Sequence, residues 1–458
     1  MKRNKKMIIV LTVVFLLTFS FVSSATTLEI IANGTEGGKN GPIIEFYKYT
    51  LKPAFEDYMK DQGKDVTLEV IETAVPDADY KTRITLDMRA GRGPDVISFD
   101  QFWLASFVEA GLLEPLEYYS SDYSNWEGWN NFNEGVKNMM AFNDKMYGFM
   151  KNTDLRMIYY NKEIFRKANV KKWWAWQPES WEDLLNTARK IKEEMPDVTP
   201  LQLNAGEQMG EATTMQGFYM ALLGAGGRLY DQSAGKWVVK SNALLDTLEL
   251  YETIYVDEKL GDGNLQVSLN ARDKTFEQYK NNEIAMLVEG IWFWTSVIKP
   301  DAAWGIKHRD SKIGWAAMPA QEPKAGINEQ DYVSISGGTG WVPSPSTDNR
   351  ELTWELLKFL NSKEMKLEIL EINPGIPARN DVAESDMIQS DPYMANIAPA
   401  LSENTTARPG FSEYEQVSRQ VQIMTGEVVT GNLTPEEALD KYAQEVTRIV
   451  GEDKVMEK

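Results

Sequence analysis

The first 110 residues alternate between strand-like and helix-like segments, and this order limits the folds that are open to the chain. Residues 28–32 and 95–99 are short apolar runs, and apolar residues alternate with polar ones over 66–70, as in buried or half-buried strands. Residues 44–62 and 80–90 carry apolar side chains at helical spacing. Each helix stands between two strands, which is typical of a parallel sheet with helices on its faces. We therefore predict an α/β fold.

A second block of the same kind begins near residue 147. It contains a strand at 157–160, a helix that starts after Ser180 and a buried strand at 284–288. A strongly helical pattern covers 435–450. The chain has 458 residues, which is enough for two or three domains because one domain usually holds about 100–200 residues.

The N-terminus has the pattern of a secretory signal peptide. Four lysine or arginine side chains in the first six residues precede an apolar run over 7–22 and the small residues Ser23, Ser24 and Ala25. We predict cleavage near Ala25, removal of residues 1–25 and an exported, periplasmic protein. The alternative is a retained N-terminal anchor, although the run is short for a membrane span of about 20 residues. Lipid attachment at a lipobox cysteine is not expected, since the chain has no cysteine.

Composition excludes several kinds of site. With no cysteine and one histidine, His308, the chain is not expected to use a thiolate nucleophile, a cysteine zinc site or a histidine triad. The formal net charge of -20 becomes -24 once the four positive charges of the leader are removed. Such a surface repels nucleic acid. We expect no nucleic-acid partner, no cofactor and no metal.

Seven short motifs follow one another across nearly the whole chain after the leader: AGRGPDV at 90–96, AGLLEPL at 110–116, LRMIYYNKEIF at 155–165, PESWEDL at 178–184, NEIAMLVEGIW at 282–292, IPAR at 376–379 and TPEEAL at 434–439. In this ordered set the chain resembles the bacterial extracellular solute-binding proteins, the large family that includes maltose-binding protein. Each motif is weak on its own, whereas the ordered set is specific.

The resemblance implies a two-lobed periplasmic-binding-protein fold of type II, with interleaved lobes, a hinge and a ligand cleft between the lobes. One lobe would contain residues 26–153 and 284–333, and the other 154–283 and 334–458. The implied function is that of the substrate-binding protein of an ABC importer, which binds a sugar and delivers it unaltered to a membrane permease. The 14 tryptophans favour an oligosaccharide. We expect a monomer without enzymatic activity.

Polar side chains directly follow two of the predicted strands. Asp100 and Gln101 come after the strand at 95–99, and Glu36 lies in the loop after the strand at 28–32. Ligands of open α/β sheets bind at the carboxyl ends of the strands, and a carboxylate can accept hydrogen bonds from two neighbouring hydroxyls. We expect all three residues to contact the ligand. The alternatives are that Asp100 caps the helix after it and that Glu36 belongs to an ordinary loop.

Aromatic side chains are candidates for stacking on a sugar ring. Trp292 and Trp294 follow the strand at 284–288, and the resemblance implies ligand-stacking aromatics in this region. We expect at least one of the two to stack, although aromatics at such spacing are often core residues. Trp341 is a further candidate, because Gly338 and its neighbouring glycines would let a ligand approach the backbone. The alternative for Trp341 is a strand residue that packs inward.

Four further residues complete the candidate site. Asp154 lies at the expected hinge, where a surface or interlobe ion pair is the alternative, above all for its neighbour Arg156. The resemblance implies ligand contacts for Gln216, for Tyr414 and for Arg379, whose guanidinium can donate several hydrogen bonds. Trp173, Trp174 and Trp176 form a dense cluster beside two lysines. We interpret that cluster as the cover of a lobe edge, with a sugar platform as the alternative.

Two other functions remain open from the residues alone. A secreted glycoside hydrolase would use a pair of carboxylates, and the many Asp and Glu residues do not exclude it. However, eight similar strand–helix steps of a barrel are not found. A binding protein for a charged solute would need several arginine or lysine side chains in its cleft, which an acidic chain makes less favourable.

Overall fold

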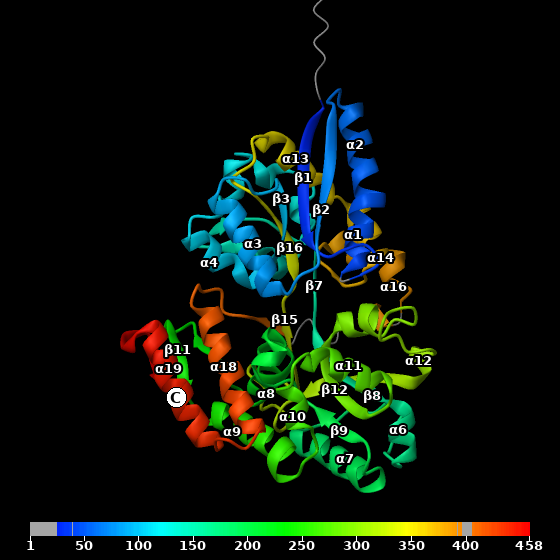
Figure 1. The fold of residues 1–458 in the computed structure, drawn as a ribbon, viewed down its shortest axis with the longest axis vertical. Helices are drawn as coiled ribbons and strands as arrows, with labels where there is room; N and C mark the ends of the chain where they lie inside the picture. Colours follow the sequence, from blue (N-terminus) through cyan, green and yellow to red (C-terminus); the bar gives the residue numbers. More distant parts are fainter. Residues whose placement is uncertain (1–24, 39, 392, 396–404) are drawn as a thin grey trace, which may run out of the picture.

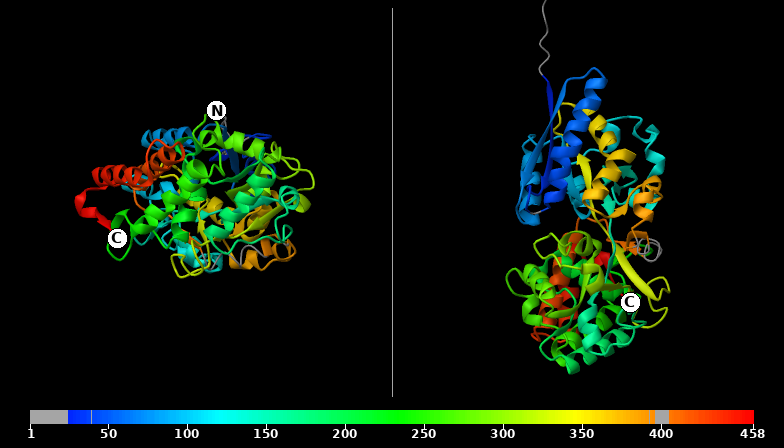
Figure 2. Two further views of the ribbon diagram at one scale, coloured as in Figure 1. Left: turned by 90° about the horizontal axis from the view of Figure 1, so that it is seen from below. Right: turned by 90° about the vertical axis from the view of Figure 1, so that its right-hand side faces the viewer.

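Two lobes lie one above the other along the long axis of the molecule, and extended segments connect them (Figures 1 and 2). The computed structural model describes residues 25–38, 40–391, 393–395 and 405–458. The leader expected at 1–25 therefore lies almost wholly outside the described residues. We name the lobe that contains β1 the upper lobe and the lobe that contains the C-terminus the lower lobe, as they stand in Figure 1.

The upper lobe is built on a sheet with the strand order β2-β1-β3-β16-β6. β1 pairs in parallel with β2 and β3, as predicted, because helices connect these strands. β16 comes from a much later part of the chain and pairs antiparallel with β3. The strands are β1 (Thr26–Asn33), β2 (Val66–Thr73), β3 (Val96–Asp100), β16 (Thr339–Pro343) and β6 (Phe149–Met150), beside the pairs β4 (Ala141–Phe142) with β5 (Lys145–Met146) and β7 (Asn152–Thr153) with β17 (Ile376–Pro377).

Helices cover the upper sheet (Figure 1). Pro53 stands in the first turn of α2, where its missing N–H costs no intrahelical bond, so the helix predicted over 44–62 is divided. The helices are α1 (Gly41–Glu45), the π-helical turn η1 (Phe46–Leu51), α2 (Lys52–Asp61), α3 (Asp77–Arg89), α4 (Leu104–Glu109), α5 (Glu134–Asn138), α13 (Arg350–Leu360), α14 (Lys363–Ile372), α15 (Asn380–Ala383) and α16 (Asp386–Gln389).

The lower lobe has a central sheet with the order β13-β8-β12-β9 and two smaller sheets. Every residue of β8 and β12 is buried, so both faces of this sheet are covered. Its strands are β13 (Ile313–Ala316), β8 (Arg156–Asn161), β12 (Ile284–Gly290) and β9 (Thr199–Gln202); the smaller sheets hold β10 (Tyr230–Asp231), β11 (Lys236–Lys240) and β19 (Val455–Glu457), and β14 (Met318–Pro319), β15 (Tyr332–Ser336) and β18 (Thr405–Ala407).

The helices of the lower lobe include the two longest of the described chain, α18 and α19. Ser180 caps α7, and Thr434 forms a capping box with Glu437 at the start of α19, as their positions in the sequence predict. The helices are α6 (Lys162–Lys167), α7 (Trp181–Glu194), α8 (Tyr219–Gly224), α9 (Asn242–Glu252), α10 (Gly263–Gln266), α11 (Ala271–Lys280), α12 (Arg309–Lys312), α18 (Tyr414–Val429) and α19 (Pro435–Val450), with π-helical turns η7 (Thr213–Phe218), η8 (Thr253–Asp257) and η9 (Phe293–Val297).

Strand pairing corrects the expected division of the chain into lobes. Residues 284–333 were assigned to the upper lobe, but β12 pairs with β8 and β9 in the lower sheet. The resemblance implies that residues 334–458 belong to the lower lobe, but β16 joins the upper sheet, and α13 packs on β16 and α14 on η1. Within the described residues, the chain crosses between the lobes near residue 154 and near 337.

One apolar core continues from the upper lobe to the lower one. Neighbouring residues of β8 alternate between two clusters of buried side chains, with Ile158 in one and Tyr159 in the other. The cluster of Tyr159 also contains the interior of the upper lobe, including Trp341. Tyr393, which follows α16, shares a 2.6 Å hydrogen bond with the Tyr159 hydroxyl and stacks on Trp294 at 4.9 Å. The lobes are therefore joined by apolar packing at this edge.

Trp341 belongs to this core, which corrects its expected contact with ligand. The side chain is 0% exposed and its Nε1 donates a 2.6 Å hydrogen bond to the Tyr47 hydroxyl. The ammonium of Lys366 lies 4.7 Å from the centroid of the indole. An inward-facing strand residue was the alternative interpretation, and the structure bears it out.

Trp341→Ala is expected to lower the free energy of unfolding by about 3–5 kcal/mol, because it leaves a cavity in the core. Tyr47→Phe removes the acceptor of the indole N–H and is expected to cost about 1–3 kcal/mol. Urea denaturation followed by circular dichroism measures both losses. A Trp341→Ala protein with unchanged stability but lost ligand affinity would contradict this placement.

Candidate ligand site between the lobes

Asp100 stands at the end of β3, at the edge of the upper sheet that faces the lower lobe (Figure 1). Its carboxylate accepts a 3.4 Å hydrogen bond from the Phe102 N–H, so the expected role as a helix cap is real. The same carboxylate lies 3.3 Å from the guanidinium of Arg408 in the lower lobe. The backbone N–H of Gln101 donates to the Gly338 carbonyl at 3.2 Å, and the Gln101 side chain is buried.

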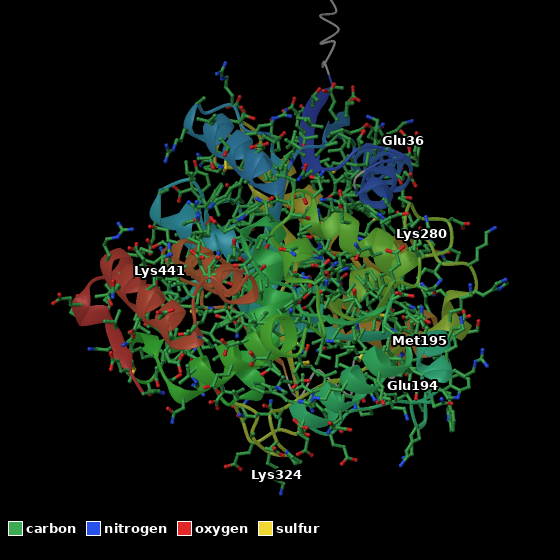
Figure 3. All side chains as sticks on the ribbon, turned by 60° about the horizontal axis from the view of Figure 1, so that its bottom comes forward. Glu36, Glu194, Met195, Lys280, Lys324 and Lys441 are labelled. Atoms are coloured by element: carbon green, nitrogen blue, oxygen red, sulfur yellow. The ribbon has the colours of Figure 1, made fainter. Side chains whose placement is uncertain are left out.

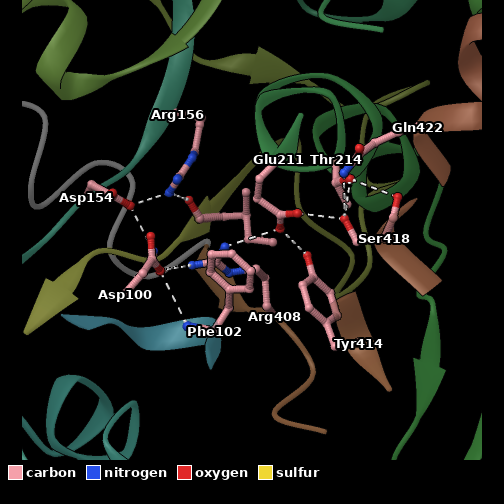
Figure 4. Close-up of polar contacts among 12 residues, drawn as sticks. Asp100, Phe102, Asp154, Arg156, Glu211, Thr214, Arg408, Tyr414, Ser418 and Gln422 are labelled. Carbon is pink, nitrogen blue, oxygen red and sulfur yellow. Dashed lines mark hydrogen bonds and ion pairs between the residues drawn. The ribbon is translucent and has the colours of Figure 1, made fainter. Parts of the chain in front are cut away.

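Arg408 connects Asp100 to a polar network in the lower lobe (Figure 4). Its guanidinium lies 3.2 Å from the Glu211 carboxylate and 4.5 Å from the centroid of the Phe102 ring. Glu211 accepts further hydrogen bonds from the hydroxyls of Tyr414 at 2.5 Å and Ser418 at 2.6 Å. We call Asp100, Arg408, Glu211, Tyr414 and Ser418 the Arg408 network. It joins the carboxyl edge of the upper sheet to the start of α18.

A second arginine is held where the chain crosses between the lobes. Arg156 forms an ion pair with Asp154 and donates a 2.9 Å hydrogen bond to the Ile335 carbonyl. The Asp154 carboxylate also accepts a 2.8 Å bond from the Gly337 N–H. The half-buried Trp292 lies against Arg156, with 5.0 Å from the guanidinium to the ring centroid.

The two guanidiniums approach each other at Gly337. A Cβ atom on this residue would lie 3.0 Å from Nη2 of Arg408 and 3.6 Å from Nη2 of Arg156. Glycine therefore leaves room for both cations beside the crossing strand. The Gly338 backbone has a φ of 133°, a backbone conformation that residues other than glycine rarely adopt. These contacts explain why glycines lead into β16.

Several buried polar atoms around this crossing have no hydrogen-bond partner among the described residues. They include Nε of Arg156, Nε of Arg408 and Oε1 of Gln216 on η7. A buried donor or acceptor without a partner costs about 1–3 kcal/mol. Both arginines and Gln216 are less than 8% exposed. The crossing therefore offers unused donors and an unused acceptor that a polar ligand or water can satisfy.

The electrostatics of the network act mainly on Asp100 and Lys151. Burial raises the pKa of Asp100 to about 6, against the attraction of Arg408, which lowers it. Burial also lowers the pKa of Lys151 to about 7, and the negative charge of Asp100 opposes this change. The Lys151 ammonium donates a 2.5 Å hydrogen bond to the Ser98 hydroxyl. The end of β3 thus holds both groups in an environment that disfavours charge.

The structure brings together most of the residues that the sequence predicts for the site. Asp100, Gln101 and Gly338 meet beside β3, and Asp154 and Trp292 meet at Arg156. Tyr414 belongs to the Arg408 network. Gln216 is buried nearby in the lower lobe, where the side chain of Met215, its neighbour on η7, approaches Gly337.

Besides Trp341, three predicted residues lie elsewhere or are already occupied. Arg379 donates to both oxygens of Asp381 and to the Asn361 carbonyl, so its guanidinium holds the upper lobe together. Trp294 is 8% exposed, with Tyr393 stacked on it and the Arg309 guanidinium 3.9 Å from its ring centroid. Protein groups therefore already occupy the side chains of Arg379 and Trp294, which corrects the expected contact of each with ligand. Glu36 is exposed on the upper lobe (Figure 3), where Lys48 and Tyr49 bind its carboxylate at 2.9 and 2.6 Å.

Sequence reasoning missed Arg408, Glu211 and Phe102. Phe102 follows the predicted Asp100 and Gln101 directly, so the strand end could have indicated it. Arg408 precedes α18 and Glu211 follows Gly210, and neither stands at the end of a recognisable strand of the main sheets. Their proximity depends on how the lobes meet, which local patterns do not contain.

A second interlobe contact lies beside the Arg408 network. The Glu415 carboxylate at the start of α18 pairs with Lys81 of α3 and accepts a 3.1 Å hydrogen bond from the Ser106 hydroxyl of α4. The Lys81 and Glu415 side chains are 23% and 29% exposed, so water screens the pair in part. This contact holds the lobes in the arrangement that the structure shows.

The stability of Asp100→Asn relative to the unchanged protein is expected to rise by roughly 1–2 kcal/mol between pH 4 and pH 8. A pKa raised to about 6 from the ordinary value of 3.8 means that the folded chain binds this proton more tightly than the unfolded chain. The stabilising contribution is complete below pH 3.8 and is lost as the pH rises through about 6. Urea denaturation of both proteins from pH 4 to pH 8 should show a difference in stability that shifts in favour of the variant as the pH rises.

Reversal of the Lys81–Glu415 pair is expected to open the lobes. Glu415→Lys places two like charges together, and exposed pairs contribute about 0.2–1 kcal/mol, so the open form should gain up to about fivefold in population. The double variant Lys81→Glu with Glu415→Lys should restore the arrangement. Small-angle scattering measures the radius of gyration.

The control for this experiment is Lys454→Glu, which reverses a 3.1 Å pair with Glu413 inside the lower lobe. It should leave the radius of gyration unchanged. Equal expansion of the control and of Glu415→Lys would contradict the interlobe role of the pair.

The described residues contain no helix that is both long and apolar enough to cross a membrane. Nor do they contain a group of three or more histidine or acidic side chains arranged to hold a metal ion. These findings concern the described part of the chain only.

Comparisons with known proteins agree with the geometry. A Brucella abortus protein whose name describes it as a binding protein is 25% identical over 402 residues, covering 87% of this chain and 88% of the relative. A maltooligosaccharide ABC transporter solute-binding lipoprotein of Streptococcus pneumoniae is 22% identical, with 85% and 83% covered. The solved structure of an ABC transporter solute-binding protein of Thermotoga lettingae with α-D-tagatose matches with a TM-score of 0.75 and 26% identity, covering 93% of this chain and all of that one.

The family model for bacterial extracellular solute-binding proteins matches residues 54–396. This range contains most of the upper lobe, these two crossings and the central sheet of the lower lobe. The two-lobed α/β fold predicted from the sequence is confirmed by the structure and by its solved neighbours. The chain belongs to the bacterial extracellular solute-binding protein family.

Proposed function

We propose that this chain is the substrate-binding protein of an ABC importer and that it binds a sugar between its lobes. The observation that carries the proposal is the convergence of Asp100 from one lobe and Arg408 from the other beside the crossing at Gly337. A ligand seated there contacts both lobes, so its binding energy is coupled to their closure. The names of relatives and neighbours, with maltooligosaccharide and tagatose among them, support a sugar.

The side chains at the crossing suit a ligand with many hydroxyl groups. The carboxylates of Asp100, Asp154 and Glu211 accept hydrogen bonds, and the two guanidiniums donate them. Three carboxylates beside two arginines nearly balance in charge, which favours an uncharged ligand over an anionic one. The half-buried ring of Trp292 supplies an apolar surface for the C–H face of a sugar ring.

Within this proposal the ligand takes over contacts that the lobes now make with each other. Asp100 and Arg408 are each other's partners in the present arrangement, and hydroxyl groups of a sugar can replace both. Gln216 and the nitrogens of the arginines that lack partners then gain hydrogen bonds. Glu36 remains a proposed contact only if the ligand displaces Lys48 and Tyr49 from its carboxylate.

The remaining parts of the proposal concern the cell. The protein would be exported by its leader, act as a monomer in the periplasm and deliver its ligand to a membrane permease without breaking a bond. Family members are binding proteins, which favours this function over the glycoside hydrolase considered from the sequence. An oligosaccharide of unspecified linkage is the ligand class that the relatives support.

The decisive experiment is a thermal-shift screen against mono- and oligosaccharides, followed by calorimetry on each sugar that stabilises the protein. A ligand that binds only the folded state raises the melting temperature. Each sugar is recovered afterwards and assayed for new reducing ends. Binding without new ends supports the proposal, and hydrolysis or the absence of any stabilising sugar overturns it.

Trp292→Ala is expected to weaken binding of the sugar found in this screen at least tenfold, because it removes the apolar surface beside Arg156. Trp174→Ala is the matched control, since this tryptophan is 61% exposed in the loop between α6 and α7. Calorimetry measures both affinities, and circular dichroism verifies the fold. Unchanged affinity in the Trp292 variant would remove Trp292 from the site.

A further inference from the structure

One surface of the lower lobe is strongly basic, although the chain as a whole is acidic. It consists of residues 162–174, which contain α6 and the loop after it, and residues 307–312, which contain α12. We call these two segments the basic face. Together they carry eight lysine or arginine residues and two acidic ones, against a net charge of -20 for the whole chain. The ligand site contributes none of these residues.

The two segments lie side by side. β13, which follows α12, pairs with β8, which precedes α6, and Ile313 stands opposite Asn161. The Lys162 ammonium donates a 3.2 Å hydrogen bond to the Asp310 carbonyl. Figure 1 shows α12 above α6 at the right-hand edge of the lower lobe. Their charges therefore act on the same region of solvent.

Four of the basic side chains are exposed and have no ion-pair partner among the described residues: Arg166, Lys171, Lys172 and Lys307. Of the others, Lys167 pairs with Glu163 and Arg309 with Asp310. The hydrogen bond from Lys167, together with the charges of Lys167, Lys312 and Arg166, lowers the pKa of Glu163, so the one carboxylate on α6 stays ionised among cations. An excess of free positive charge remains on this face.

The same face carries the one exposed tryptophan of the described chain. Trp174 is 61% exposed, and its ring lies edge-on to the half-buried Trp173 at 5.6 Å. Trp176 is buried and packs edge-on against Phe165 of α6 at 5.1 Å. The Val170 N–H donates to the Phe165 carbonyl at 2.9 Å. The loop is thus fixed to α6 and holds Trp174 outward beside Lys171 and Lys172.

We propose that the basic face docks on an anionic membrane surface. Tryptophan favours the boundary between lipid and water, and lysine side chains beside it are attracted by anionic headgroups. On a chain with a large net negative charge, an anionic membrane repels the molecule as a whole and attracts this face, so the basic face should determine how the molecule approaches. A soluble anion would account for the lysines but would leave an indole exposed to water.

Docking through this face leaves the ligand site free. α6 and α12 lie on the opposite edge of the lower lobe from α18 (Figure 1), which carries Tyr414 and Ser418 of the Arg408 network. The basic face therefore supplies a membrane contact that is separate from the edge where the lobes open. The proposal does not depend on the identity of the ligand.

Co-sedimentation with vesicles tests the proposal, using protein recovered from the exported fraction. The vesicles contain either phosphatidylcholine alone or phosphatidylcholine with about 30% phosphatidylglycerol, which makes their surface anionic. We expect binding to the anionic vesicles only, and its loss at about 1 M salt, where the screening length falls to about 3 Å. Lys171→Glu with Lys172→Glu should lower the partition coefficient roughly tenfold or more.

Two further variants separate charge from aromatic contact. Trp174→Ala should also weaken binding to the anionic vesicles, and its remaining binding should keep the dependence on salt. The matched control Lys60→Glu with Lys363→Glu reverses two exposed lysines of the upper lobe and should bind as the unchanged protein does. Circular dichroism verifies that each variant folds.

Three results would overturn the proposal. The first is no binding to anionic vesicles, and the second is equal binding to both kinds of vesicle. The third is an equal loss of binding in the Lys171/Lys172 and Lys60/Lys363 variants, which would indicate net charge alone. Binding of the chain to a soluble anionic polysaccharide but not to anionic vesicles falls under the first result and would assign the face to a different macromolecule.

Discussion

Arg408 contacts acidic side chains on both lobes, and the arrangement of the whole molecule depends on this one buried cation. Asp100 approaches it from the upper sheet and Glu211 from the lower lobe. A buried guanidinium with only one of these carboxylates would be poorly compensated, because removing a charge from water is expensive. The lobes therefore meet where both carboxylates can reach it, and Phe102, Tyr414 and Gly337 pack around that meeting point.

The local part of this structure could be predicted from the sequence, and the long-range part could not. The strands and helices of residues 28–110 follow from apolar spacing, and Asp100 follows from its place after a strand. The position of 284–333 was predicted wrongly, because β12 is a buried strand whose partners, β8 and β9, leave no trace in its own residues. Arg408 was missed for the same reason. Trp341 and Arg379 have side chains suited to a ligand, but their protein partners already occupy them.

The groups at the end of β3 are kept at a cost to stability. Burial disfavours the charged forms of both Asp100 and Lys151, and the unpartnered nitrogens of Arg156 and Arg408 add to that cost. Natural binding sites commonly retain such groups because function needs them more than the fold does. In the upper lobe core, by contrast, Trp341 has a partner for its only polar atom. Buried polar groups without partners thus mark the candidate ligand site, whereas the buried polar group of the core has its partner.

The apolar core that runs through Tyr159, Tyr393 and Trp294 gives the boundary between the lobes two unlike edges. Opening along this edge would expose aromatic surface to water, whereas opening along the Arg408 edge exposes charges that water solvates well. The lobes should therefore open by rotation about the aromatic edge, while the charged edge moves apart. A solute then enters at the Arg408 edge, whose charges water solvates well, and the aromatic edge that forms the axis of rotation stays closed to water.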